Sequence, residues 1–214
     1  FDTPIGRFEG IEEPLARIAG KTWMMSATRT LTCGALDIGE RPAVLGNVAK
    51  AYLTEGMREV VSDAMDIRAG SAIQRGPRNL LSRMWMAVPI GITVEGANIL
   101  TRSMIIYGQG AIRSHPWVGK LIDSVEKKDN KAFDRALFGY VNFFGTRFVR
   151  TWLLGLSGGR LARAPDTADM GRCYQQLSRY SAAFAFISDI AMGTLGGSLK
   201  RREKISGRMA DVLA

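Results

Sequence analysis

The chain has 214 residues and a mass of 23.4 kDa, enough for one or two ordinary domains. Hydrophobic residues make up 46% of the chain and charged residues 23%, which excludes a disordered or low-complexity protein. One histidine and two cysteines exclude a structural zinc site with four such ligands and argue against a disulfide framework, so we expect no metal site and a reducing, cytoplasmic location.

The charge is unevenly distributed. Residues 1–100 carry 11 basic and 11 acidic side chains, whereas residues 101–214 carry 18 and 9, which accounts for the net charge of +9. A solvated helix face is the simplest interpretation of this basic half. An anionic membrane surface or an acidic partner are alternatives. Nucleic acid is not expected, because no recognition motif is present.

Helical periodicity dominates the chain. Apolar residues recur at spacings of three and four over residues 12–36, which indicates one face of a helix. Gly39 is suited to end that helix and Pro42 to begin the next. Glycine, proline and asparagine predict a loop over 70–80, and Pro89 is expected to end a short helix, because its ring removes a helical hydrogen bond. The predicted helices cover residues 12–36, 42–69, 80–88, 95–108, 132–156 and 170–195.

The second half contains a nearly apolar stretch over 180–197. It is shorter than the roughly 20 apolar residues of a membrane-spanning helix and includes Asp189, so we expect the core of a helix pair. Because no strand pattern appears, we predict an all-α chain. We expect a helical bundle domain over 1–115 and a basic helical extension over 116–214.

Glu95 is the one acid in the apolar segment PIGITVEGANILT, residues 89–101. One interpretation is structural, because a carboxylate is favourable at the start of a helix. The other is a general base in an apolar pocket, where desolvation raises a carboxyl pKa and the helix terminus opposes that shift. Gly96 beside it has no side chain, so a flat ligand has room to approach the backbone.

Four segments together resemble acyl-CoA dehydrogenases, and most closely the C-terminal helical part of the large bacterial fatty-acyl-CoA dehydrogenases. They are PIGRFEGIEEPLARIAG, SDAMDIRAGSAI, IGITVEGANILTRSMIIYGQGAIRSHP and LGGSLKRREKISGRMADVL, in this order along the chain. The resemblance implies a FAD-dependent enzyme of fatty-acid β-oxidation that converts medium- or long-chain acyl-CoA to trans-2-enoyl-CoA. Glu95 would then be the base that removes the α proton.

The resemblance also implies roles for neighbouring residues. Gly96 would contact substrate, and Ala97, Asn98 and Ile99 would contact FAD, although Ala97 stands where the family often has threonine. Asp66, at a position where glutamine is usual, and Gly70 would lie in a loop that receives the cofactor of a neighbouring subunit. The implied partners are an electron-transfer flavoprotein, a second copy of the chain in a dimer or larger oligomer, and the inner membrane as a peripheral contact.

Two other functions are consistent with the sequence. The chain could be a non-catalytic helical module for docking or membrane attachment, or part of a flavin-dependent acyl-CoA oxidase. Because it begins with phenylalanine, we expect it to be a piece of a longer protein that is not active by itself.

Overall fold

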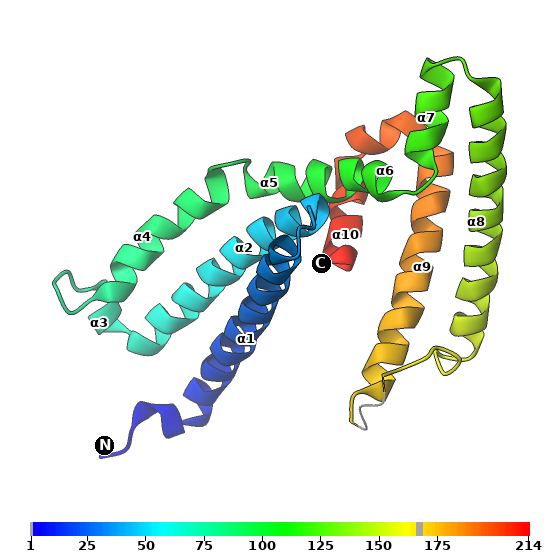
Figure 1. Ribbon diagram of the computed structural model, residues 1–214. Helices are drawn as coiled ribbons and strands as arrows, with labels where there is room; N and C mark the ends of the chain where they lie inside the picture. Colours follow the sequence, from blue (N-terminus) through cyan, green and yellow to red (C-terminus); the bar gives the residue numbers. More distant parts are fainter. Residues whose placement is uncertain (1, 166–168) are drawn as a thin grey trace. The chain divides into compact units, whose positions relative to one another are not determined.

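The computed structural model describes residues 2–165 and 169–214. Within these ranges every regular element is a helix and no strand occurs (Figure 1), which confirms the all-α prediction. The chain forms two compact units, one built from residues up to Ile106 and the other from Tyr107–Leu213. The first unit therefore ends before the boundary predicted near residue 115.

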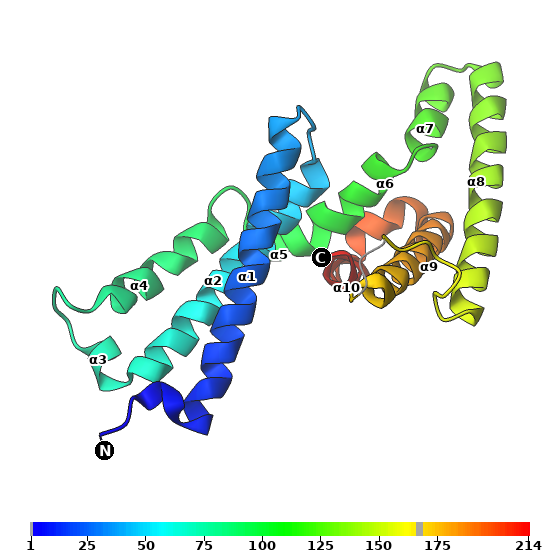
Figure 2. The same cartoon turned by 60° about the horizontal axis from the view of Figure 1, so that its bottom comes forward.

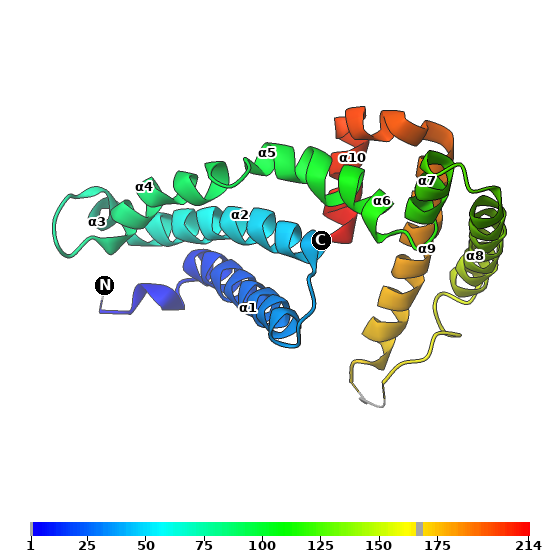
Figure 3. The ribbon, with the colours of Figure 1, turned by 45° about the horizontal axis from the view of Figure 1, so that its top comes forward.

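The first unit is built around α2, which packs against α1 on one side and α4 on the other (Figure 3). Arg17 on α1 pairs with Asp63 on α2 at 3.0 Å. Val61 of α2 packs with two residues of α4, Val88 and Ile92, in a small buried core. The elements are η1 (Ile5–Arg7), α1 (Glu9–Asp37), α2 (Ala43–Arg68), α3 (Gly70–Ile73), α4 (Leu80–Thr93) and α5 (Asn98–Leu100), followed by the π-helix η2 (Thr101–Gln109).

The predicted helix end at Pro89 is wrong, because α4 continues to Thr93. Val88 and Ile92 lie on either side of the proline and are both buried against Val61. This packing offsets the hydrogen bond that the proline cannot donate. The predicted loop over 70–80 is also shorter than expected, because α3 occupies its first four residues.

The helix predicted over 95–108 is present, but its bounds and its helix type differ from the prediction. It begins at Asn98, widens into the π-helix η2 and continues as α6 (Gly110–Ser114). Gly108 therefore does not end it. A Cβ atom at Gly108 would lie 2.9 Å from Oγ of Ser206. The glycine therefore allows the backbone to pack closely against Ser206 and does not end the helix. π-Helical turns are rare and occur often at functional sites.

The second unit contains two long antiparallel helices, α8 and α9, lying side by side (Figure 1). Phe144 and Phe148 of α8 contact the ring of Phe186 on α9. The hydroxyl of Thr151 donates to the Ala182 carbonyl at 3.0 Å. The elements are α6, α7 (Val118–Glu126), α8 (Asn130–Leu156), α9 (Gly171–Leu195), η3 (Gly196–Arg201) and α10 (Glu203–Leu213).

The helix pair predicted around residues 180–197 is present. Ala182, Ser188 and Asp189 on one face of α9 are buried, whereas Tyr180 and Ile187 are exposed. Within the described part of the chain, the continuous helical segment Gly171–Arg201 is long and apolar enough to cross a membrane by length and composition alone. A core helix of a soluble protein passes the same test, so this property by itself assigns no membrane span.

Candidate functional site

Glu95 lies in the tight turn that joins α4 to α5, which can be followed in Figure 2. Its φ angle is +55°, and that of Gly96 is +95°. Glycine adopts such angles freely, but a glutamate there is strained by about 1–3 kcal/mol. Strained residues of this kind persist where the surrounding structure holds them, and they occur often at active sites.

The expectation of a buried Glu95 in an apolar pocket is wrong for the chain by itself. Glu95 is exposed, and so are the apolar side chains of Val94 and Ile99, by 50% and 84% respectively. Apolar neighbours in sequence do not bury a residue when the backbone turns outward between them. In the described residues, the N–H group of Glu95 also makes no hydrogen bond, which leaves a donor available beside the carboxylate.

Lys50 of α2 stabilises this turn through hydrogen bonds. Its ammonium group donates hydrogen bonds to the carbonyl of Ile92 at 3.2 Å, the carbonyl of Gly96 at 2.6 Å and Oδ1 of Asn98 at 2.7 Å. These three bonds use all three donors of the ammonium. Because they reach residues on both sides of Glu95, Lys50 fixes where the turn begins and ends.

Asn98 completes this network from the start of α5. Asn98 is 5% exposed, and the two N–H groups of its side-chain amide are shared among three acceptors: Oγ1 of Thr54 at 2.8 Å, the carbonyl of Ala51 at 3.2 Å and Oε1 of Glu55 at 3.1 Å. The side chain is thus engaged inside the first unit. The predicted contact of Asn98 with FAD can therefore be made only by its backbone and not by its side chain.

Sequence reasoning missed Lys50, Thr54 and Glu55. Lys50 and Thr54 lie one helical turn apart on α2, on the same face as Val61, which packs against α4. Polar residues that interrupt an apolar face at this spacing are a signal for a buried partner. The identity of that partner, 42 to 48 residues further along the chain, is not readable from the spacing.

The remaining predicted site residues fall into two groups that the chain does not bring together. Gly96, Ala97 and Ile99 accompany Glu95 at the α4–α5 turn, and Ala97 and Ile99 are exposed. Asp66 lies in the last turn of α2, about 24 Å from Lys50 along the helix axis. Gly70 begins α3, and both residues are exposed. Figure 1 shows α3 and α5 at opposite ends of the α2–α4 pair.

The backbone at both groups is open to a flat cofactor. A Cβ atom on Gly70 would meet nothing within 4 Å, and one on Gly96 would meet only Oγ1 of Thr101, at 3.5 Å. Ala69, next to Gly70, has a φ of +47°, so a strained non-glycine residue occurs at each group. Residues 2–165 and 169–214 contain no cluster of three or more potential metal ligands.

The second unit contains a separate buried polar cluster. Nε2 of His115 lies 3.1 Å from Oδ1 of Asp189, and the side chains are 5% and 2% exposed. Nδ1 of His115 accepts the N–H groups of Trp117 and Val118, each at 3.1 Å, so the single proton of the neutral ring lies on Nε2. Burial lowers the pKa of His115 and raises the pKa of Asp189.

Two comparisons with protein families cover nearly the whole chain. Residues 1–109 match the family model described as "Acyl-CoA dehydrogenase, C-terminal domain". Residues 112–214 match a second model, described as "Acyl-CoA dehydrogenase, C-terminal, bacterial type". No solved structure matches the chain.

Proposed function

Because this chain belongs to the acyl-CoA dehydrogenase family, we propose that it supplies the catalytic base and part of the flavin site of an oxidoreductase that converts medium- or long-chain acyl-CoA to trans-2-enoyl-CoA. Glu95 is the base in this proposal. The observation that carries it is the strained, exposed turn at Glu95 and Gly96, clamped from inside by Lys50.

The chemistry follows from what this turn presents. The Glu95 carboxylate takes the proton from the carbon next to the thioester carbonyl. The N–H of Glu95, which has no partner among the described residues, donates to the thioester oxygen as negative charge develops there. A substrate and cofactor covering Val94 and Ile99 would exclude water from the carboxylate and raise its basicity.

FAD is the proposed cofactor, and when bound it supplies the acceptor for the β hydrogen, which leaves as hydride. Gly96, Ala97, Ile99 and the backbone of Asn98 would hold one cofactor. Asp66 and Gly70 would contact the cofactor of a neighbouring subunit, which requires a dimer or larger oligomer. The two groups lie at opposite ends of the α2–α4 pair (Figure 1), so one flavin ring system does not contact both.

The test is anaerobic bleaching of the yellow enzyme that carries this chain by a long-chain acyl-CoA. In Glu95→Gln we expect flavin to remain bound and the bleaching rate to fall by roughly 10²–10⁴-fold, because the base is lost. Glu40→Gln makes the same chemical change at an exposed residue outside the site and should bleach normally. Normal bleaching in Glu95→Gln would refute the assignment of the base.

The same preparation separates the other two candidate functions. An oxidase would consume oxygen in the absence of an electron acceptor, whereas a dehydrogenase would require an electron-transfer flavoprotein as the acceptor. A non-catalytic docking module would bind no flavin.

The proposal also includes a cytoplasmic location, with peripheral attachment of the enzyme to the inner membrane. It is supported by the basic second half of the chain and by the exposed apolar residues of α9. Sedimentation with anionic vesicles that disappears at high salt is the expected result.

A further inference from the structure

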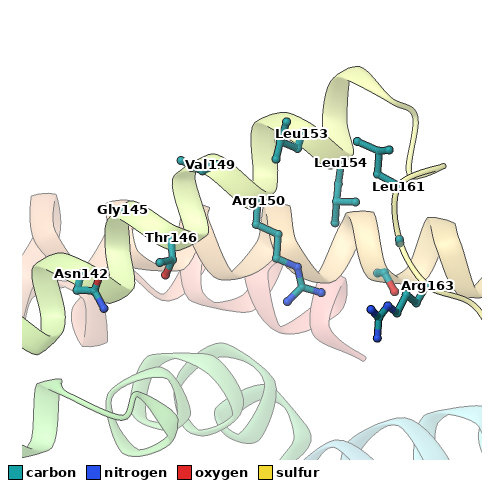
Figure 4. Close-up of a pocket in the computed structure, with 11 residues that line it drawn as sticks. Asn142, Gly145, Thr146, Val149, Arg150, Leu153, Leu154, Leu161 and Arg163 are labelled. Carbon is teal, nitrogen blue, oxygen red and sulfur yellow. The ribbon is translucent and has the colours of Figure 1, made fainter.

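A cavity of about 770 Å³ opens in the second unit. Its walls come from α8, from the segment that follows α8 and from Ser178 on α9 (Figure 4). This volume lies within the range of small-molecule sites. None of the residues proposed for the acyl-CoA or flavin sites lines it, so the cavity is separate from the proposed active-site residues.

Two arginines supply all the charge of this cavity. Arg150 projects from α8 toward the side where Arg163 lies, on the segment after the helix (Figure 4). No acidic residue lines the cavity, and no carboxylate in residues 2–165 and 169–214 pairs with either arginine. Two guanidinium groups on one cavity wall, with no counter-charge among the residues that the structure describes, favour an anionic ligand, because guanidinium matches carboxylate and phosphate oxygens well.

The rest of the wall contains apolar side chains together with the polar residues Asn142, Thr146 and Ser178. Val149, Leu153 and Leu161 line the cavity with exposed side chains, and Leu154 closes it from the buried side. On α8 the lining residues recur at spacings of three and four, so one helix face presents both the leucines and Arg150. The wall therefore combines apolar side chains with the positive charge of Arg150, which lies between Val149 and Leu153 along α8.

We propose that this cavity binds a single-chain amphipathic anion of the fatty-acid class, with its carboxylate on Arg150 and Arg163 and its chain along the leucines. An inorganic anion would leave the apolar side chains of the wall exposed to water. A neutral lipid would leave both arginines without a counter-charge. Only a ligand with both parts satisfies both features, and a free fatty acid is the simplest such molecule.

The test is isothermal titration of the whole chain with decanoate below its micelle concentration. We expect saturable binding with one site per chain, and weaker binding of decanol and of inorganic phosphate. Arg150→Gln and Arg163→Gln should each weaken decanoate binding about tenfold or more, because each removes a charge-assisted hydrogen bond. Arg135→Gln, an exposed arginine on the same helix outside the cavity, is the matched control and should bind like the parent chain.

Three results would overturn the proposal. The first is no saturable decanoate binding, and the second is phosphate binding as tight as that of decanoate, which would indicate an anion site without a chain. The third is arginine-dependent binding to anionic vesicles with none to monomeric decanoate, which would indicate a membrane headgroup contact. Helical circular dichroism of each variant checks folding. If an arginine variant does not fold, Leu161→Gln, at an exposed position, tests the apolar part of the wall, and unchanged decanoate affinity in it refutes the proposal.

Discussion

Replacing Lys50 by methionine tests whether the polar network holds the turn of the candidate active site. Methionine keeps an unbranched apolar stem but removes the ammonium. The carbonyls of Ile92 and Gly96 and the Oδ1 atom of Asn98 then lose the donor that lies 2.6–3.2 Å away. Asn98 is buried, so its oxygen is the least able to find water as a replacement.

The size of the effect follows from these contacts. A hydrogen bond to a charged group contributes about 1.5–3 kcal/mol to stability, and less where water replaces the partner. Since Lys50 is half-buried and makes three such bonds, we expect the free energy of unfolding of the first unit to fall by about 2–4 kcal/mol. For a unit of this size the corresponding fall in Tm is about 10 °C or more.

The assay is urea unfolding followed by circular dichroism and by tryptophan fluorescence. Lys21→Met is the matched control, because Lys21 pairs with Glu59 on the surface between α1 and α2, and a surface pair contributes about 1 kcal/mol or less. If Lys50→Met destabilises the chain no more than Lys21→Met does, the network does not hold the turn and the reasoning fails.

Two further predictions concern the second unit. Gly139→Ala should destabilise it by about 1–3 kcal/mol in urea unfolding, because the new Cβ would lie 2.6 Å from the ring of Trp117. The control is Gly155→Ala on the same helix, where the new Cβ meets nothing within 4 Å and should stabilise the unit slightly. Equal effects of the two substitutions would refute the packing argument. In Asp189→Asn, the free energy of unfolding should fall as the pH decreases below about 6.5, by at most about 1.4 kcal/mol per pH unit, because burial lowers the pKa of His115 and the unfolded chain alone takes up the proton. The raised pKa of Asp189 opposes this trend in the parent chain. A double variant that also carries His115→Gln should lose this dependence of stability on pH, since the chain has one histidine. A pH dependence that persists in the double variant would contradict its assignment to His115.

The long helices could be predicted because their signals are local. The α8 helix (Asn130–Leu156) was expected over 132–156, and α9 (Gly171–Leu195) over 170–195. Each helix is long enough for the apolar spacing to repeat over several turns, so the helix can be identified even though its ends are uncertain by one or two residues. The same local reasoning failed at Pro89, where the expected break is overridden by burial of the residues on either side.

Glu95 could be singled out because it is an acid in an apolar segment with a family motif around it. Its exposure, its positive φ angle and the path of the turn were not predictable from neighbouring residues. They depend on α2 lying against α4, which places Lys50 beneath residues 92–98. The same packing engages the Asn98 side chain internally.

The sequence by itself determined that this protein is helical, where most of its helices run and which family it belongs to, since periodicity and motifs are properties of consecutive residues. Only the tertiary structure decided which polar groups meet. The ammonium of Lys50 reaches the carbonyl of Gly96 across 46 residues, and Arg150 and Arg163 share one cavity. Such encounters depend on how helices pack, and helix spacing alone does not specify that packing.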